Sequence, residues 1–330
     1  MKNLTIGKIR GLQQIATGEG FFTMLAIDHR GSLREMINKG HPEKVTYDDI
    51  VTRKLELCGT LAKYASAVLL DPVYGAAQCI SKGVLPPDTG LLVSIEATGY
   101  TGGKEKRLTT ILEGWGVEKI KRMGAQAVKM LVYYRSDLKE VADKQLAAIK
   151  SIADECIKWD IPLVLEAVSY PIGDELNNPA KFAAKKEQLV IQAADEITAL
   201  PIDVLKSEFP ASISGSDEAE CLNICQRLND ASRVPWVVLS QGVDYEVFAK
   251  QVEIACRSGA SGFLGGRAIW KESAQVVDAK GRVDFVKTVA ARRLKTLVEI
   301  TRKNAIPWYR KVGLGPDELT ETSEAWYQSY

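Results

Sequence analysis

Eight short apolar runs, spaced at near-regular intervals, are the feature of this 330-residue chain that most limits its fold. The runs are rich in valine, isoleucine and leucine, and they cover residues 22–28, 67–71, 91–96, 127–134, 162–168, 203–209, 235–242 and 262–269. Short runs of this kind are typical of strands that are buried on both faces. The interval from one run to the next averages roughly 34 residues, which is enough for one strand and one crossover helix.

The segments between the runs carry charge and a helical period, clearest in residues 138–159, 181–200 and 246–258. Eight alternations of strand and helix predict an α/β fold with a closed (β/α)8 barrel, the TIM-barrel architecture. A doubly wound open sheet is the alternative, but it normally has fewer strands. We expect a single domain over residues 1–330. A helix at 6–17 would precede a barrel core at about 21–285, and an extension at 286–330 would hold a helix at 287–303 and an acidic tail.

Composition excludes several function classes. The formal net charge of +1 argues against nucleic acid as a partner, because such proteins carry a clear cationic surplus. No apolar run approaches the roughly 20 residues that cross a bilayer, and residues 1–20 do not form a secretory signal. The six scattered cysteines are expected to be reduced and buried, which favours a cytoplasmic protein. With two histidines, a three-histidine zinc site is impossible in one chain, and the number of subunits is left open.

Ionisable side chains gather at the carboxyl ends of the predicted strands, where barrels of this kind bind their ligands. They are Asp28, Asp71, Glu96, Lys129, Glu166, Lys206 and Glu208. Strand alternation gives Lys129, Glu166 and Lys206 the parity of one face on their respective strands. Burying such charges costs several kcal/mol each unless they are paired, so one interpretation is a purely structural ion-pair network.

The functional interpretation starts from two lysines close together. An amine must be uncharged to attack a ketone, yet the ordinary pKa of lysine is about 10.4. Partial desolvation and a neighbouring cation both lower a lysine pKa, so Lys129 would make Lys206 a usable nucleophile. The resulting imine acts as an electron sink, and Glu166 with Asp28 would move protons during carbon–carbon cleavage. Such a mechanism uses no metal and no cofactor.

Two glycine-containing loops follow the seventh and eighth predicted strands. They read Ser240-Gln241-Gly242 and Gly265-Gly266-Arg267, and they offer open backbone N–H groups and a guanidinium. Loops at these two positions frequently bind phosphate in eight-stranded barrels. His29 and Arg30, directly after Asp28, are further candidates for substrate contacts, although His29 is equally well explained as a hydrogen-bonding neighbour.

At these residues the chain resembles the tagatose 1,6-bisphosphate aldolases, class I enzymes that use a lysine Schiff base. The likeness extends to residues 304–308 and is carried by Ala26-Ile27-Asp28, Leu69-Leu70-Asp71-Pro72-Val73-Tyr74-Gly75, Ala127-Val128-Lys129, Leu165-Glu166, Asp203-Val204-Leu205-Lys206, Ser240-Gln241-Gly242-Val243 and Gly266-Arg267-Ala268-Ile269-Trp270. The resemblance implies a lyase that cleaves tagatose 1,6-bisphosphate to dihydroxyacetone phosphate and glyceraldehyde 3-phosphate. It makes Lys206 the Schiff-base lysine, Glu166 the proton shuttle, and Asp28 and Lys129 supporting charges. Ser240, Gly242, Gly266 and Arg267 would hold the C1 phosphate.

Some positions depart from that family. His29 stands where glutamine is usual, Ala97 where lysine is common, and residues 134–137 look more like the related aldolases of 6-deoxy-6-sulfofructose 1-phosphate. In that alternative the products are dihydroxyacetone phosphate and sulfolactaldehyde, and Arg135 would meet the phosphate or sulfonate at C6. A surface arginine paired with Asp137 is an equal alternative. Three further alternatives are open: Tyr330 folds over the site, the protein is a phosphosugar isomerase or epimerase, or it is a non-catalytic sugar-phosphate sensor.

Overall fold

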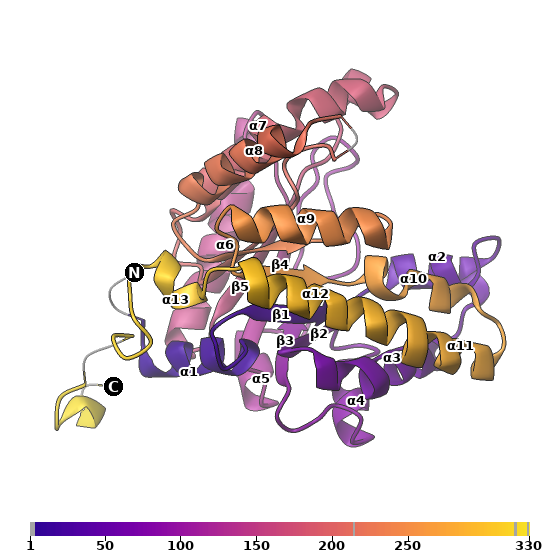
Figure 1. Ribbon diagram of the computed structural model, residues 1–330, viewed down its shortest axis with the longest axis horizontal. Helices are drawn as coiled ribbons and strands as arrows, with labels where there is room; N and C mark the ends of the chain where they lie inside the picture. Colours follow the sequence, from indigo (N-terminus) through magenta and orange to yellow (C-terminus); the bar gives the residue numbers. More distant parts are fainter. Residues whose placement is uncertain (1–3, 214, 320–321, 329) are drawn as a thin grey trace.

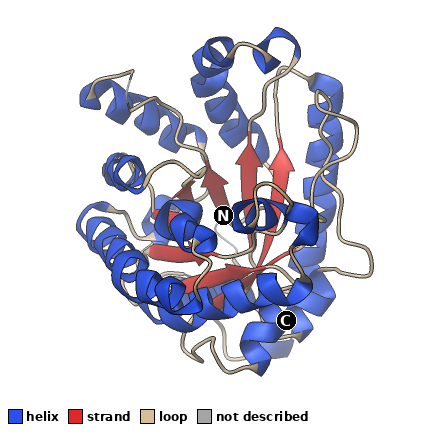
Figure 2. Cartoon of the chain, turned by 90° about the vertical axis from the view of Figure 1, so that its right-hand side faces the viewer, coloured by secondary structure: helices blue, strands red, loops and turns tan. Residues whose placement is uncertain are grey.

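The computed structural model describes residues 4–213, 215–319, 322–328 and 330, and its centre is a closed barrel of eight parallel strands. Helices surround the strands on the outside (Figure 2). The strands are β1 Phe22–Ala26, β2 Ala67–Leu70, β3 Gly90–Ser94, β4 Ala127–Tyr133, β5 Leu163–Val168, β6 Val204–Ser207, β7 Trp236–Leu239 and β8 Gly262–Gly265. The predicted (β/α)8 barrel is therefore confirmed.

The helices alternate with the strands and continue past the barrel (Figure 1). The α-helices are α1 Ile6–Ile15, α2 Gly31–Ile37, α3 Tyr47–Leu61, α4 Ala76–Ser81, α5 Val117–Arg122, α6 Lys139–Lys158, α7 Pro179–Ile197, α8 Glu218–Ala231, α9 Tyr245–Arg257, α10 Arg267–Gln275, α11 Ala279–Phe285, α12 Ala291–Asn304 and α13 Trp308–Lys311. Shorter helical turns are η1 Pro42–Lys44, η2 Ala62–Tyr64, η3 Gly173–Leu176, η5 Trp326–Gln328 and the π-helical η4 Val286–Ala290.

Two predicted segments differ from the structure. The run at 262–269 is not one strand, because β8 ends at Gly265 and α10 begins at Arg267. Its last residues, Ala268 and Ile269, are buried on a helix, and burial alone does not distinguish a short strand from a buried helix. The predicted helix at 287–303 is also divided, with the π-helical turn η4 leading into α12.

The strands divide the apolar core into two layers. Side chains such as Leu25, Leu165 and Leu205 point outward and pack under the helices, whereas Met24, Val164 and others fill the barrel interior. This alternation is the period of two that strand geometry imposes. At the amino end of the barrel, the interior layer is continuous with the apolar side chains of α1. The barrel is thus closed at its amino end.

The C-terminal extension crosses the outside of the barrel and ends beside α1 (Figure 1). Trp308 belongs to the interior apolar layer at the amino end, and its backbone N–H donates to the Gly20 carbonyl at 2.9 Å. The Tyr330 hydroxyl accepts a hydrogen bond from the Gly7 N–H of α1 at 3.1 Å. Tyr330 therefore lies at the end opposite the strand carboxyl termini, and the alternative in which it folds over the site is wrong. Among the described residues, no helix is long and apolar enough to cross a membrane.

Candidate active site

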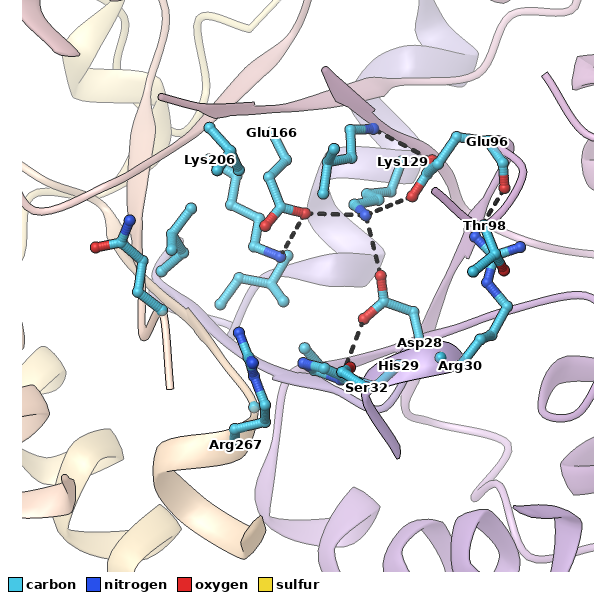
Figure 3. Close-up of a pocket in the computed structure, with 18 of the residues that line it drawn as sticks. Asp28, His29, Arg30, Ser32, Glu96, Thr98, Lys129, Glu166, Lys206 and Arg267 are labelled. Atoms are coloured by element: carbon cyan, nitrogen blue, oxygen red, sulfur yellow. Dashed lines mark hydrogen bonds and ion pairs between the residues drawn. The ribbon is translucent and has the colours of Figure 1, made fainter. Parts of the chain in front are cut away.

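A cavity of about 460 Å³ opens at the carboxyl ends of the barrel strands. Its wall includes most of the residues proposed from the sequence, namely Asp28, His29, Arg30, Lys129, Glu166, Lys206, Ser240, Gln241, Gly266 and Arg267. These residues come from positions as far apart as 28 and 267, and the closed barrel alone brings them together. Figure 3 shows the side chains of Asp28, Lys129, Glu166, Lys206 and Arg267 around the same space.

Glu166 joins the two lysines. Its Oε2 lies 2.9 Å from Nζ of Lys206 and 2.9 Å from Nζ of Lys129 (Figure 3). The strand register explains this contact, since Glu166 of β5 is paired directly with Lys206 of β6 and with Leu131 of β4. Lys206 and Lys129 are both nearly buried, at 4% and 1% exposure. A carboxylate in contact with both amines can pass a proton to or from either one.

Lys129 is surrounded by carboxylates. Besides Glu166, its Nζ contacts Asp28 at 3.0 Å and Glu96 at 2.7 Å, and Glu96 also accepts the Leu131 N–H at 3.2 Å. Burial by itself would lower the pKa of Lys129, but Asp28, Glu166 and Glu96 outweigh it and raise that pKa. Lys129 therefore stays charged. The three carboxylates that contact it offset much of the electrostatic effect that its charge has on Lys206.

The same lysines act on the carboxylates in return. Burial alone would raise the pKa values of Glu166 and Asp28, yet Lys129 and Lys206 lower both pKa values below their usual range. Both groups are therefore carboxylates at neutral pH. The sequence pointed to a second cation as the main influence on Lys206, whereas the structure adds a shared carboxylate between the two amines.

His29 is largely buried and lies close to several cationic side chains. Burial lowers the pKa of His29 to about 3, and Arg267, Lys54 and Lys206 add to the effect against the opposing charge of Asp28. Its ring packs edge-on against Trp270, with the ring centroids 5.1 Å apart. Its buried Nδ1 makes no hydrogen bond among the described residues and lies 3.7 Å from Oδ1 of Asp28. A neutral imidazole that lines a cavity can donate a hydrogen bond to a bound hydroxyl or accept one from it.

The loops after β7 and β8 meet at one end of the cavity. The Gly266 N–H donates a hydrogen bond to Ser240 Oγ at 3.5 Å, and Arg267 begins α10 with its buried Nε unpartnered among the described residues. A side chain at Gly266 would collide with His29, since a Cβ there would lie 2.8 Å from the ring. The N-terminus of α10 and the unpartnered guanidinium nitrogen together favour an anion.

Arg30 marks the other side of the cavity. Its Nη2 donates to the Glu96 carbonyl at 2.8 Å, and Ser32 and Thr98 lie on the same wall (Figure 3). Ser32 and Thr98 carry no sequence motif and were not predicted. Tyr133 shares the inward parity of Lys129 on its strand and also lines the cavity, although it was not among the predicted site residues.

Arg135 is not at the cavity, contrary to its predicted contact with substrate. Its buried guanidinium pairs with Asp137 at 2.7 Å and with Glu175, and it donates to the Tyr170 carbonyl at 2.7 Å. Hydrogen bonding to Arg135 helps to lower the pKa of Glu175 to about 2. β4 ends at Tyr133, so the chain has left the inward-facing alternation before Arg135, and this arginine ties loops together behind the barrel wall.

Three other predicted positions lie outside the cavity, and a fourth, Gln241, lines the cavity with its side chain turned away from the charged centre. Asp71 is buried against Lys54, with Nζ 2.5 Å from its carboxylate, and does not line the cavity. Glu208 follows the end of β6 and binds the Ser169 N–H at 2.6 Å outside the cavity. A Cβ at Gly265 would meet Phe248, so this residue faces outward. The Gln241 side chain turns toward Lys186 and Glu208, which leaves its backbone for an anion.

Comparisons with known proteins agree with this geometry. The family described as DeoC/LacD family aldolase matches residues 22–272. The tagatose 1,6-diphosphate aldolase of Staphylococcus aureus strain JH9 is 32% identical over 322 residues, which cover 92% of this chain and 98% of that protein.

Solved structures share the fold at lower identity. A Schiff-base-forming fructose-1,6-bisphosphate aldolase is 19% identical with a TM-score of 0.58, covering 88% of this chain and 98% of its own. The fructose-bisphosphate aldolase of Slackia heliotrinireducens is 14% identical with a TM-score of 0.63, covering 91% and 94%. The family match and the curated relative show that the chain belongs to the DeoC/LacD family of aldolases and is a lyase.

Proposed function

We propose that this protein is a class I aldolase in which Lys206 forms the Schiff base, and that it cleaves tagatose 1,6-bisphosphate reversibly to dihydroxyacetone phosphate and glyceraldehyde 3-phosphate. The observation that carries the proposal is the carboxylate of Glu166, 2.9 Å from both lysine amines inside the cavity. The Staphylococcus aureus relative, whose name gives tagatose 1,6-diphosphate as its substrate, supports the choice of sugar.

In the proposed reaction, residues of the site carry out the proton transfers. Lys206 passes a proton to Glu166 and attacks the C2 carbonyl. Glu166 then returns this proton to the C2 oxygen, so that the carbinolamine loses water, the imine forms in its protonated state, and Glu166 is a carboxylate again. A base, Glu166, then takes the proton of the C4 hydroxyl while the C3–C4 bond breaks, and the electron pair moves into the imine to give an enamine. Protonation at C3 and hydrolysis release dihydroxyacetone phosphate and return Lys206. Lys129 and Asp28 keep a fixed charge beside Glu166 throughout. The imine is the electron sink, so the proposed reaction uses no metal or cofactor.

The two ends of the cavity suit the two phosphates. Arg267, Gly266 and the turn after Ser240 would hold the C1 phosphate next to Lys206, and Arg30 with Ser32 and Thr98 would hold the C6 phosphate. We favour phosphate over sulfonate at C6, because the Staphylococcus aureus relative is named for a diphosphate. Arg135 is committed to Asp137 and Glu175, so it does not distinguish the two groups. The buried cysteine thiols are in keeping with a cytoplasmic enzyme.

Borohydride trapping tests the proposal. Dihydroxyacetone phosphate plus borohydride should attach one three-carbon unit to the protein, and peptide mass mapping should locate it on Lys206 and not on Lys129. The Lys206→Ala variant should have neither the adduct nor turnover. An adduct on another lysine, or cleavage by Lys206→Ala, would contradict the assignment. Ketose 1-phosphates with phosphate, sulfonate or hydroxyl at C6, compared by kcat/KM, test the choice of sugar.

A further inference from the structure

The turn after β7 has a backbone conformation that its sequence does not favour. Residues 240–243 form a tight turn in which the Val243 N–H donates to the Ser240 carbonyl at 3.0 Å. Gln241 and Gly242 have φ values of +47° and +80°, as in a type I′ turn. Glycine adopts this left-handed region freely, but a glutamine does so at a cost. Something outside the turn must therefore hold Gln241.

The Gln241 side chain is fixed at both ends of its amide. Lys186 Nζ of α7 donates to Oε1 at 2.7 Å, and Nε2 donates to Oε1 of Glu208. Glu208 is 2% exposed, and its other oxygen accepts the Ser169 N–H at 2.6 Å. Burial raises the pKa of Glu208, with Lys186 opposing that rise. The glutamine is thus held from α7 and from the loop directly after β6.

The turn is also the wall of the cavity beside Arg267. A Cβ at Gly242 would lie 3.2 Å from the Arg267 guanidinium. Within the part of the chain that the structure describes, the N–H groups of Gln241 and Gly242 make no hydrogen bond. Successive free N–H groups in a left-handed turn form a concave site for an anion. Their direction depends on the φ of residue 241.

We propose that Lys186 and Glu208 are positioning residues for anion binding: by holding the Gln241 amide they keep the turn in its left-handed form, with its N–H groups ready for a phosphate. Neither residue touches the ligand. Where the ligand is the sugar's C1 phosphate, the inference rests on the proposed function. Since Glu208 lies two residues after Lys206, the clamp also fixes the phosphate site relative to the reacting amine.

The test replaces Lys186, because replacement of the buried Glu208 is expected to destabilise the fold. The probe is inorganic phosphate, whose dissociation constant is measured by calorimetry on the full chain. Lys186→Met should raise that constant about 5- to 30-fold, the ratio that corresponds to the cost of a left-handed residue. Lys185→Met is the matched control, because the neighbouring Lys185 pairs with Glu175 and not with Gln241, and it should leave the constant unchanged.

The decisive measurement repeats the Lys186→Met substitution in a protein that already carries Gln241→Gly. Glycine keeps the left-handed turn without a clamp, so Lys186→Met should there have no effect on the dissociation constant. An equal loss in both backgrounds would mean that Lys186 attracts phosphate by its charge alone, and the proposal would be overturned. Wild-type protein that binds no phosphate would overturn it as well.

Kinetics separate this inference from the proposed function. Lys186→Met should raise KM for the ketose bisphosphate more than it lowers kcat, whereas a general loss of structure lowers both kcat and the thermal midpoint. If the wild type forms no Schiff base and cleaves no sugar, the proposed function fails. The phosphate measurements then still decide the role of Lys186.

Discussion

Replacing His29 with glutamine should remove a specific part of the protein's sensitivity to acid. The pKa of His29 is lowered to about 3 in the folded chain, chiefly by burial, while an unfolded histidine titrates near 6.5. Below pH 6.5 the unfolded chain therefore binds a proton at His29 that the folded chain does not bind. The stability that neutral His29 contributes is complete above pH 6.5 and is lost as the pH falls toward 3.

The size of this effect follows from the two pKa values. At pH 5 the linkage amounts to about 2 kcal/mol in the free energy of unfolding, and at pH 8 it vanishes. Asp28 and Glu166 contribute little to this comparison, because carboxylates with lowered pKa values lose their stabilising effect only below about pH 4.

Urea unfolding at pH 5 and pH 8 measures the difference directly. Wild type should lose about 2 kcal/mol more than His29→Gln between the two pH values. His41→Gln is the matched control, because His41, the second of the two histidines, is exposed beside Glu43. If His29→Gln and wild type lost the same stability, the burial argument for His29 would be refuted.

Three further predictions concern the charged centre. Glu166→Gln should lower kcat by about 10² to 10⁴, the range for a proton-transfer group, while Glu187→Gln, which breaks an exposed pair with Arg227, should leave steady-state kcat unchanged. Full activity in the first variant would exclude Glu166 as the proton shuttle. Lys129→Met should lower the free energy of unfolding by about 3 to 5 kcal/mol at pH 7, because it leaves three buried carboxylates without their common partner; a loss below about 1 kcal/mol by urea titration would contradict the network. Dialysis against EDTA should leave turnover unchanged, and a loss that added divalent metal restores would contradict the imine mechanism.

The sequence was sufficient to predict the barrel and to place three charged side chains together at the carboxyl ends of its strands. Strand alternation is a local property of the backbone, so the parity of Lys129, Glu166 and Lys206 could be read from each run by itself. The eightfold alternation of apolar runs with helical segments likewise predicted the architecture, because each crossover between parallel strands needs a helix. These inferences hold within the strands, where a residue's direction is set by its neighbours in the chain.

Only the tertiary structure decided what happens where the strands end. Arg135 and Glu208 lie one or two residues beyond their strands, lose the alternation, and turn behind the barrel wall to bind other groups. Register between strands placed Glu166 against both lysines, and it depends on how β4, β5 and β6 align in space. Contacts between distant segments, such as the clamp on Gln241, leave no periodic signal, because their partners are joined by packing and not by position along the chain.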